Sequence, residues 1–295
     1  MMHATRIYQI LNHYTPRDAL DPGFEVLDNS QNLKPDWFEY WPMRNYLLGQ
    51  PLDEQTFYGF LSPKFKLKTN LSAAQAREFI VTSPAHTDVV LFSPSIHNSA
   101  YFWNVFEHGD SEHPGLKSVA ERFFARIGRP TPLDSLVTDS RNTVHSNYFI
   151  ARPRFWRAWL GVTEQLYAIA EDQQDPLGAE LRAATSYRGS VSVPMKIFLM
   201  ERIATWLLVS DPTLVSCARD PFASRSRLYK LPMAITCDAL KIAYATQGRG
   251  QYKDVFLLMR ALTPFWNRQF QLGGFLAPVR RCLDRLKFYW EQAPR

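Results

Sequence analysis

The residues with the clearest potential for chemistry are Glu201 and Arg202, which stand together inside the apolar run 195–209. The spacing of this run predicts a buried helix. Burying a carboxylate is costly unless it is paired or reached by solvent, so two interpretations are open. Either Glu201 and Arg202 take part in a structural ion pair, or Glu201 faces a pocket where a raised pKa suits it as a general base.

A second group of polar residues lies in segment 21–65, beside predicted strand ends. Its candidates for ligand binding are Asp28, Asn29, Arg44, Ser62 and Lys64. In open α/β sheets, ligands bind beyond the carboxyl ends of the strands. Lys64 follows the predicted strand 56–61, where a lysine can meet a phosphate as a point charge. The alternative is that Ser62 and Pro63 form an ordinary turn that ends the strand.

Segment 104–115 gathers three acids and two histidines, among them Glu107 and His108. These are metal-ligand types, but the spacing is not HExxH and matches no zinc pattern. We assign no metal ligands, and Mg²⁺ or Mn²⁺ stays open as a cofactor. The segment is either a solvated acidic loop or a loop that binds an acceptor or a metal. Asp139 and Asn142 offer hydrogen-bonding groups for sugar hydroxyls, or they form a turn through their own backbone.

The elements that must position these residues alternate between strand and helix. The predicted strands are 6–11, 56–61, 88–93 and 147–152, and the predicted helices are 37–48, 72–82, 99–106, 116–127, 154–172, 195–209, 237–246 and 251–262. This order predicts an α/β fold with a mainly parallel twisted sheet flanked by helices. Segment 17–36 is expected to be loop, and 211–235 a loop with room for a short strand. We expect one domain over 1–235 and a helical C-terminal appendage over 236–295.

Composition narrows the class of protein. The chain has 295 residues, 46% of them apolar, and carries 34 Lys and Arg against 28 Asp and Glu, a formal charge of +6. A disordered chain is excluded by this apolar content. The basic balance favours nucleotide phosphates, nucleic acid or an anionic membrane as partner, or it belongs to a merely soluble surface. Nucleic-acid binding is not expected, because the aromatic residues stand mostly at helical core spacing.

The cysteines and the termini predict a cytoplasmic protein. Cys217, Cys237 and Cys282 are scattered and form no CxxC pair, which favours a reducing compartment. The start of the chain lacks the features of a signal peptide, and no run is long enough for a membrane span. Segment 275–290 combines basic and apolar residues, which predicts either peripheral binding to the inner membrane or a helix packed on the core.

Several stretches occur in an order typical of one family. They are Asp28-Asn29, Glu39-Tyr40-Trp41-Pro42-Met43-Arg44-Asn45, Tyr58-Gly59-Phe60 followed by Ser62-Pro63-Lys64-Phe65, Asn147-Tyr148-Phe149-Ile150, and Phe198-Leu199-Met200-Glu201-Arg202-Ile203-Ala204-Thr205-Trp206-Leu207. Over residues 6–209 the pattern resembles a glycosyltransferase-like family of bacterial capsule and lipopolysaccharide gene clusters. Segment 62–65 departs from it, because the family has a His-Tyr-Arg-Arg run there.

The resemblance implies a GT-A-like fold that transfers a sugar from a nucleotide-sugar donor to a glycan or lipid-linked acceptor. Glu201 would be the catalytic base. The donor would be bound by Asp28, Asn29, Arg44, Ser62, Lys64 and Arg202, and the acceptor by Glu107, His108, Asp139 and Asn142. The alternative is a non-catalytic scaffold protein of polysaccharide assembly at the membrane surface.

Overall fold

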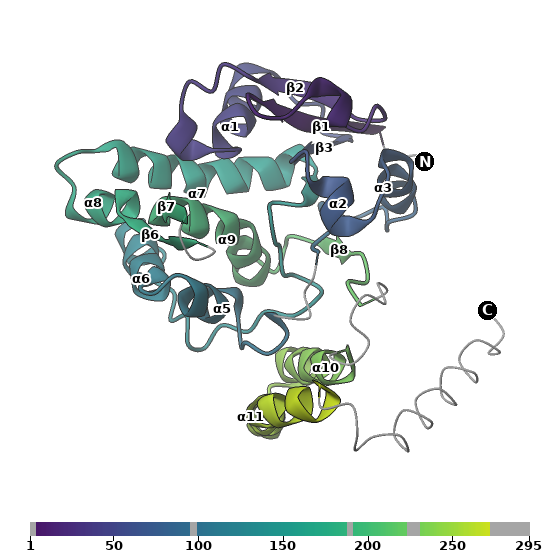
Figure 1. Cartoon of the computed structure of the whole chain (residues 1–295), viewed down its shortest axis with the longest axis vertical. Helices are drawn as coiled ribbons and strands as arrows, with labels where there is room; N and C mark the ends of the chain where they lie inside the picture. The colour runs from purple at the N-terminus through teal and green to yellow at the C-terminus, as the bar shows by residue number, and fades with distance from the viewer. Residues whose placement is uncertain (1–3, 95–98, 188–190, 223–230, 272–295) are drawn as a thin grey trace. The chain divides into compact units, whose positions relative to one another are not determined.

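The computed structural model describes residues 4–94, 99–187, 191–222 and 231–271. The chain divides into two compact units, 1–224 and 225–295. The predicted boundary at 235 is too late, because residues Leu231–Gln247 form one helix, α10. The predicted division into a larger N-terminal unit and a helical C-terminal unit otherwise agrees with the structure (Figure 1).

The first unit is built on a six-stranded sheet in the order β2-β1-β3-β5-β4-β8. Its strands are β1 (Ala4–Asn12), β2 (Glu25–Asn29), β3 (Thr56–Leu61), β4 (Val89–Leu91), β5 (Phe149–Ala151) and β8 (Ser216–Ala218). β1 pairs in parallel with β2 and β3, and β4 with β8, whereas β5 runs antiparallel between β3 and β4. The predicted α/β class and mainly parallel sheet are therefore confirmed.

The prediction that segment 17–36 is entirely loop is wrong, because it contains strand β2. Glu25 to Asn29 pair with Tyr8 to Asn12 of β1, and β2 forms one edge of the sheet. An edge strand is buried weakly and lacks a continuous apolar run, so its own residues give little signal. Its pairing with β1 stabilises it instead. β8, at the other edge, is the short strand allowed for in segment 211–235.

Helices cover both faces of the sheet. They are α1 (Tyr40–Gly49), α2 (Phe65–Thr69), α3 (Ala73–Val81), α5 (Val105–Glu112), α6 (Leu116–Arg126), α7 (Pro153–Glu171), α8 (Pro176–Arg182) and α9 (Met195–Ser210). The described part of the unit also contains two short 3₁₀ segments, Arg17–Ala19 and Pro35–Trp37, and a hairpin of β6 (Ala184–Tyr187) and β7 (Val191–Pro194).

The prediction that segment 104–115 is a loop is wrong, because most of it forms helix α5. Asn104 begins helix α5: its side-chain oxygen accepts hydrogen bonds from the backbone N–H groups of Phe106 and Glu107, both at 2.9 Å. Asparagine is a strong N-cap residue, and this cap fixes the start of the helix at 105. The helix predicted over 99–106 therefore lies too early in the chain.

Two apolar clusters lie on opposite faces of the sheet. The larger one joins Tyr8, Phe60 and Phe149 of the strands to α1, α6, α7 and α9. The smaller one joins Ile7, Phe57 and Ile150, which point the other way, to α2 and α3. The long helix α7 packs against β3 and β5 (Figure 1). Alternate residues of each strand thus serve different clusters, as expected for a sheet covered on both faces.

The second unit contains α10 and α11 (Gly250–Gln271), packed against each other. Gly248, at φ 67°, ends α10 in the left-handed conformation that glycine adopts without strain. The two helices predicted over 237–246 and 251–262 are confirmed in kind and are longer than expected. The amphipathic tail 275–290 lies outside the described residues. Among the residues that the structure describes, no helix is long and apolar enough to cross a membrane.

Candidate functional site

The carboxyl ends of β1 and β3 meet the start of the antiparallel strand β5. We call this row of strand ends the edge of the sheet; it is distinct from the two edge strands, β2 and β8. Ser62, directly after β3, places its hydroxyl 2.6 Å from the hydroxyl of Tyr148, directly before β5. The Gln9 amide donates to the backbone carbonyl of Ser62 at 3.2 Å. Ser62 and Tyr148 are both buried. The Ser62 hydroxyl thus joins two strand ends and shapes the edge of the sheet.

Two carboxylates from distant segments act electrostatically on Tyr148: beyond the effect of burial, Glu39 and Glu201 both raise the pKa of its hydroxyl. Glu39 immediately precedes α1, and Glu201 lies in the first half of α9. Both are partly buried, and neither accepts a side-chain hydrogen bond or ion pair within the described part of the chain. Burial and the nearby Glu201 carboxylate raise the pKa of Glu39 to about 7. Burial also raises the pKa of Glu201, against the lowering effect of Arg202 and Lys68.

Two lysines supply positive charge to the same cluster. Lys64 and Lys68 both oppose the rise in the pKa of Glu39. The Lys68 ammonium donates to the Ser146 hydroxyl at 2.9 Å and lies 5.5 Å from the centre of the Tyr148 ring. Both lysine side chains are exposed, so they are accessible to an anionic ligand. We call Glu39, Glu201, Lys64, Lys68 and Tyr148 the edge cluster.

Backbone strain is concentrated in the loops that form the edge cluster. Phe38, just before Glu39, has φ 47° and ψ −129°, and Ser146 and Asn147, just before Tyr148, have φ 59° and 53°. Positive φ is unfavourable for a side chain as large as phenylalanine. Strained residues of this kind persist where the surrounding structure over-determines them, and they gather at functional sites. The buried Asn147 also keeps its side-chain oxygen without a hydrogen-bond partner in the described chain.

A network of charges holds the strained segment before Glu39. The Glu171 carboxylate accepts hydrogen bonds from the Trp37 indole at 2.8 Å and from Lys34 at 2.6 Å. Lys196, which is only 1% exposed, pairs with Asp36 and lies 4.1 Å from the centre of the Trp37 ring. Because these contacts fix segment 34–37 on α7 and α9, they also fix the start of α1 and hence Glu39.

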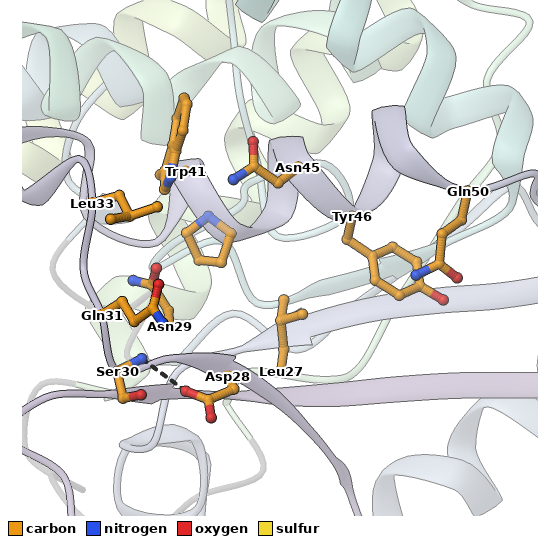
Figure 2. A pocket seen from close by; sticks show the side chains of 11 residues that line it. Leu27, Asp28, Asn29, Ser30, Gln31, Leu33, Trp41, Asn45, Tyr46 and Gln50 are labelled. Carbon is orange, nitrogen blue, oxygen red and sulfur yellow. Dashed lines mark hydrogen bonds between the residues drawn. The ribbon is translucent and has the colours of Figure 1, made fainter.

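A pocket of about 480 Å³ opens between the end of β2 and α1. Its lining includes Asp28, the amides of Asn29, Gln31, Asn45 and Gln50, and the ring of Trp41. Figure 2 shows Trp41 and Asn45 on α1 facing Asp28 and Ser30 across the pocket. Hydrogen bonds from Ser30 hold the pKa of Asp28 below its usual range, so Asp28 is ionised at neutral pH. The pocket thus presents an anion, several amides and an aromatic ring.

Arg44 belongs to a different environment from the other expected donor-binding residues. Its guanidinium donates to both oxygens of Glu164, at 2.6 and 2.7 Å, and lies 4.6 Å from the centre of the Tyr167 ring. This bidentate pair joins α1 to α7. Arg44 is therefore held by a protein carboxylate, which competes with any bound phosphate for its guanidinium.

Against the effect of burial, Arg202 lowers the pKa of its neighbour Glu201, but the hydrogen bonds of its guanidinium in the described structure go elsewhere. Its guanidinium donates instead to the backbone carbonyls of Val105 at 3.0 Å and Phe198 at 2.6 Å. Gly109 makes room for it, because a Cβ there would collide with the Arg202 side chain. Arg202 thus fastens α5 to α9 inside the core, whereas Glu201 belongs to the edge cluster. Burial raises the pKa of Glu201, but Glu201 does not line the pocket between β2 and α1, so its role as a base stays a prediction.

The four expected acceptor residues fall in two places. The Glu107 carboxylate accepts a hydrogen bond from the Trp103 N–H at 2.6 Å, and the His108 ring lies 5.7 Å from that of His145. Asp139 and Asn142 form a turn, in which Asn142 accepts from the Asp139 N–H at 3.0 Å. The buried Asp139 carboxylate is bound by Arg141. Among the described residues, no three His, Cys, Asp or Glu side chains are grouped to hold a metal ion.

Lys64 and Glu201, two of the predicted site residues, each act on the pKa of Glu39, and their roles in donor binding and catalysis stay predictions. The structure adds residues to which the sequence gave no role. Glu39 belongs to the segments that carry the family resemblance, and Lys68 has no predicted role. Lys68 stands four residues after Lys64, the spacing that places two side chains on one face of a helix. That spacing was the available signal for Lys68. The proximity of Glu39 to Glu201 had none, because it depends on the packing of α9 beside the start of α1.

Comparison of the chain with known proteins identifies no relative. Protein-family models, curated proteins and solved structures were each compared with the chain, and none of the three comparisons finds a match.

Proposed function

We propose that the chain is a glycosyltransferase of GT-A-like fold that passes a sugar from a nucleotide-sugar donor to a growing bacterial surface glycan. The edge cluster is the observation that carries this proposal. It combines two carboxylates of raised pKa with two exposed lysines, at the edge of a mostly parallel sheet where ligands of α/β proteins bind. A base and a site for a leaving diphosphate are the two parts that sugar transfer needs.

The pocket between β2 and α1 suits the nucleoside of the donor. Asp28 accepts a ribose hydroxyl or a base N–H, and the amides of Asn29 and Asn45 offer both donors and acceptors to a base edge. Trp41 provides an aromatic surface on which a base can stack. β2, β1 and β3 are parallel, so the pocket at the end of β2 and Lys64 after the end of β3 lie on the same side of the sheet, and a diphosphate could extend from the nucleoside towards the edge cluster.

The edge cluster would perform the transfer in one displacement. The ionised carboxylate of Glu39 or Glu201 takes the proton of the acceptor hydroxyl, and the hydroxyl oxygen forms a bond to C1 of the donor sugar. The bond from C1 to the diphosphate oxygen breaks, and the diphosphate leaves with the electron pair. Lys64 and Lys68 stabilise the charge that develops on it. Lys68 takes the place first given to Arg44, which Glu164 already binds.

The test is donor binding and donor turnover by the full-length chain. We expect a nucleoside diphosphate or nucleotide sugar from a panel of common bases to raise the melting temperature, because it binds only the folded state. Lys64→Ala and Lys68→Ala should each reduce release of nucleoside diphosphate by about tenfold or more. Lys66→Ala is the matched control, because Lys66 is an exposed lysine on the same helix without a contact to Glu39.

The alternative of a non-catalytic scaffold predicts the opposite result. A chain that neither binds nor turns over any donor of the panel would contradict the proposed activity. If a donor binds equally well to the wild type, Lys64→Ala and Lys68→Ala, the chain has a nucleotide site, but the edge cluster is not part of it.

A further inference from the structure

The basic excess of the chain belongs entirely to its C-terminal unit. Residues 225–295 contain 13 Lys and Arg against 4 Asp and Glu, a formal charge of +9. Residues 1–224 contain 21 against 24, a formal charge of −3. A charge that is divided so sharply between two units is typical of a protein in which one unit meets an anionic surface.

The same unit exposes a row of aliphatic side chains on α11. Val255, Leu258 and Leu262 are 44%, 59% and 40% exposed, and their spacing places them on one face of the helix. Leu257, 45% exposed, widens this face. Phe256 and Thr263, on the opposite side, are buried. The helix is therefore packed along one side and presents an apolar side to its surroundings.

We propose that this face of α11 docks on the surface of an anionic lipid bilayer. An interfacial helix buries aliphatic side chains at the boundary between headgroups and acyl chains, and basic residues around it are attracted to anionic lipids. The exposed leucines and valine provide the first element. The second is the formal charge of residues 225–295, +9 by sequence, to which Arg249, Lys253 and Arg260 on or directly before α11 contribute. The inference is independent of sugar transfer, because it uses no residue of the edge cluster or of the nucleoside pocket.

Charge and chemistry together favour lipid over other occupants. A second copy of the chain would bring two units of +9 against each other, which opposes self-association through this face. A nucleic acid would satisfy the charge but would lay a polar phosphate backbone on Val255, Leu258 and Leu262, which offer it no hydrogen bond. An anionic bilayer satisfies both the charge and the apolar side chains.

The experiment is co-sedimentation of the full-length chain with vesicles. We expect binding to phosphatidylcholine vesicles that contain about one-third phosphatidylglycerol, and much weaker binding to pure phosphatidylcholine or at high salt. The double variant Leu258→Glu and Leu262→Glu should bind at least about tenfold more weakly, because two leucines that the bilayer would bury are lost and two negative charges are added. Leu48→Glu, at a 53% exposed leucine of α1, is the matched control and should bind like the wild type.

Circular dichroism and thermal melting establish that the double variant is folded, and Val255→Glu provides a second, single substitution on the same face. Equal sedimentation of wild type and variants would overturn the proposal, as would no binding to anionic vesicles. Two further outcomes would also reject it: tighter binding to duplex DNA than to vesicles, or a dimer that the double variant dissociates while vesicle binding is unchanged.

Discussion

The carboxyl group of Glu39 should make the stability of the first unit depend on pH. Burial and the Glu201 carboxylate raise its pKa from the ordinary 4.5 to about 7, so the folded chain binds this proton more tightly than the unfolded chain. The contribution of Glu39 to stability is therefore present below pH 4.5 and is lost as the pH rises towards 7. Above pH 7 the folded chain holds an ionised carboxylate in an unfavourable place.

The magnitude follows from the same values. At about 1.4 kcal/mol per pH unit, the difference between 4.5 and 7 corresponds to about 3 kcal/mol of unfolding free energy between pH 4 and pH 8. Glu39 keeps some contact with solvent, so we expect about 2–3 kcal/mol. Glu39→Gln cannot ionise, and the variant should be more stable than the wild type at pH 8 by this amount and by less than about 1 kcal/mol at pH 5. A smaller decline remains from Glu201, whose pKa is also raised.

The assay is urea unfolding at pH 5, 6, 7 and 8, followed by tryptophan fluorescence. Six of the eight tryptophans lie in residues 1–224, so the signal reports mainly on the unit that contains Glu39. Glu54→Gln is the control: a hydrogen bond from Arg157 lowers the pKa of Glu54, so its contribution has the opposite sign and appears above pH 4.5. If the unfolding free energies of Glu39→Gln and the wild type differ by the same amount at every pH, the raised pKa assigned to Glu39 is wrong.

Three further predictions concern the same region. Glu171→Gln should lower the unfolding free energy by about 2 kcal/mol, measured by urea unfolding at pH 7, because Trp37, Lys34 and the buried Lys196 share that carboxylate; no change would show that the network contributes nothing. Phe38→Gly should raise the free energy of unfolding by about 1 kcal/mol, and with it the melting temperature, because glycine adopts φ 47° without strain. A lower melting temperature would mean that the contacts of the Phe38 side chain stabilise the fold by more than its backbone strain costs. Sugar transfer, where a donor is found, should increase as the pH rises through about 7, because the base acts in its ionised form; a rate independent of pH from 6 to 8 would exclude Glu39 as that base.

The sequence by itself determined the elements that have a strong local signal. The buried strands β1, β3, β4 and β5 and the helices α6, α7 and α9 follow from apolar runs and from helical spacing, which depend only on neighbouring residues. The cost of burying a carboxylate also follows from the sequence, since Glu201 stands within an apolar helix wherever that helix packs. The α/β class could therefore be predicted, whereas the sequence left open whether Glu201 pairs with Arg202 or has a raised pKa.

Only the tertiary structure decided which residues meet. Arg44 and Glu164 lie far apart in the chain, and their pairing requires α1 to pack on α7. The proximity of Glu39 to Glu201, the direction of β5 and the edge strand β2 likewise depend on contacts between distant segments. Local spacing carries no information on such contacts, because many partners of the right charge or shape are available to each residue until the chain is folded.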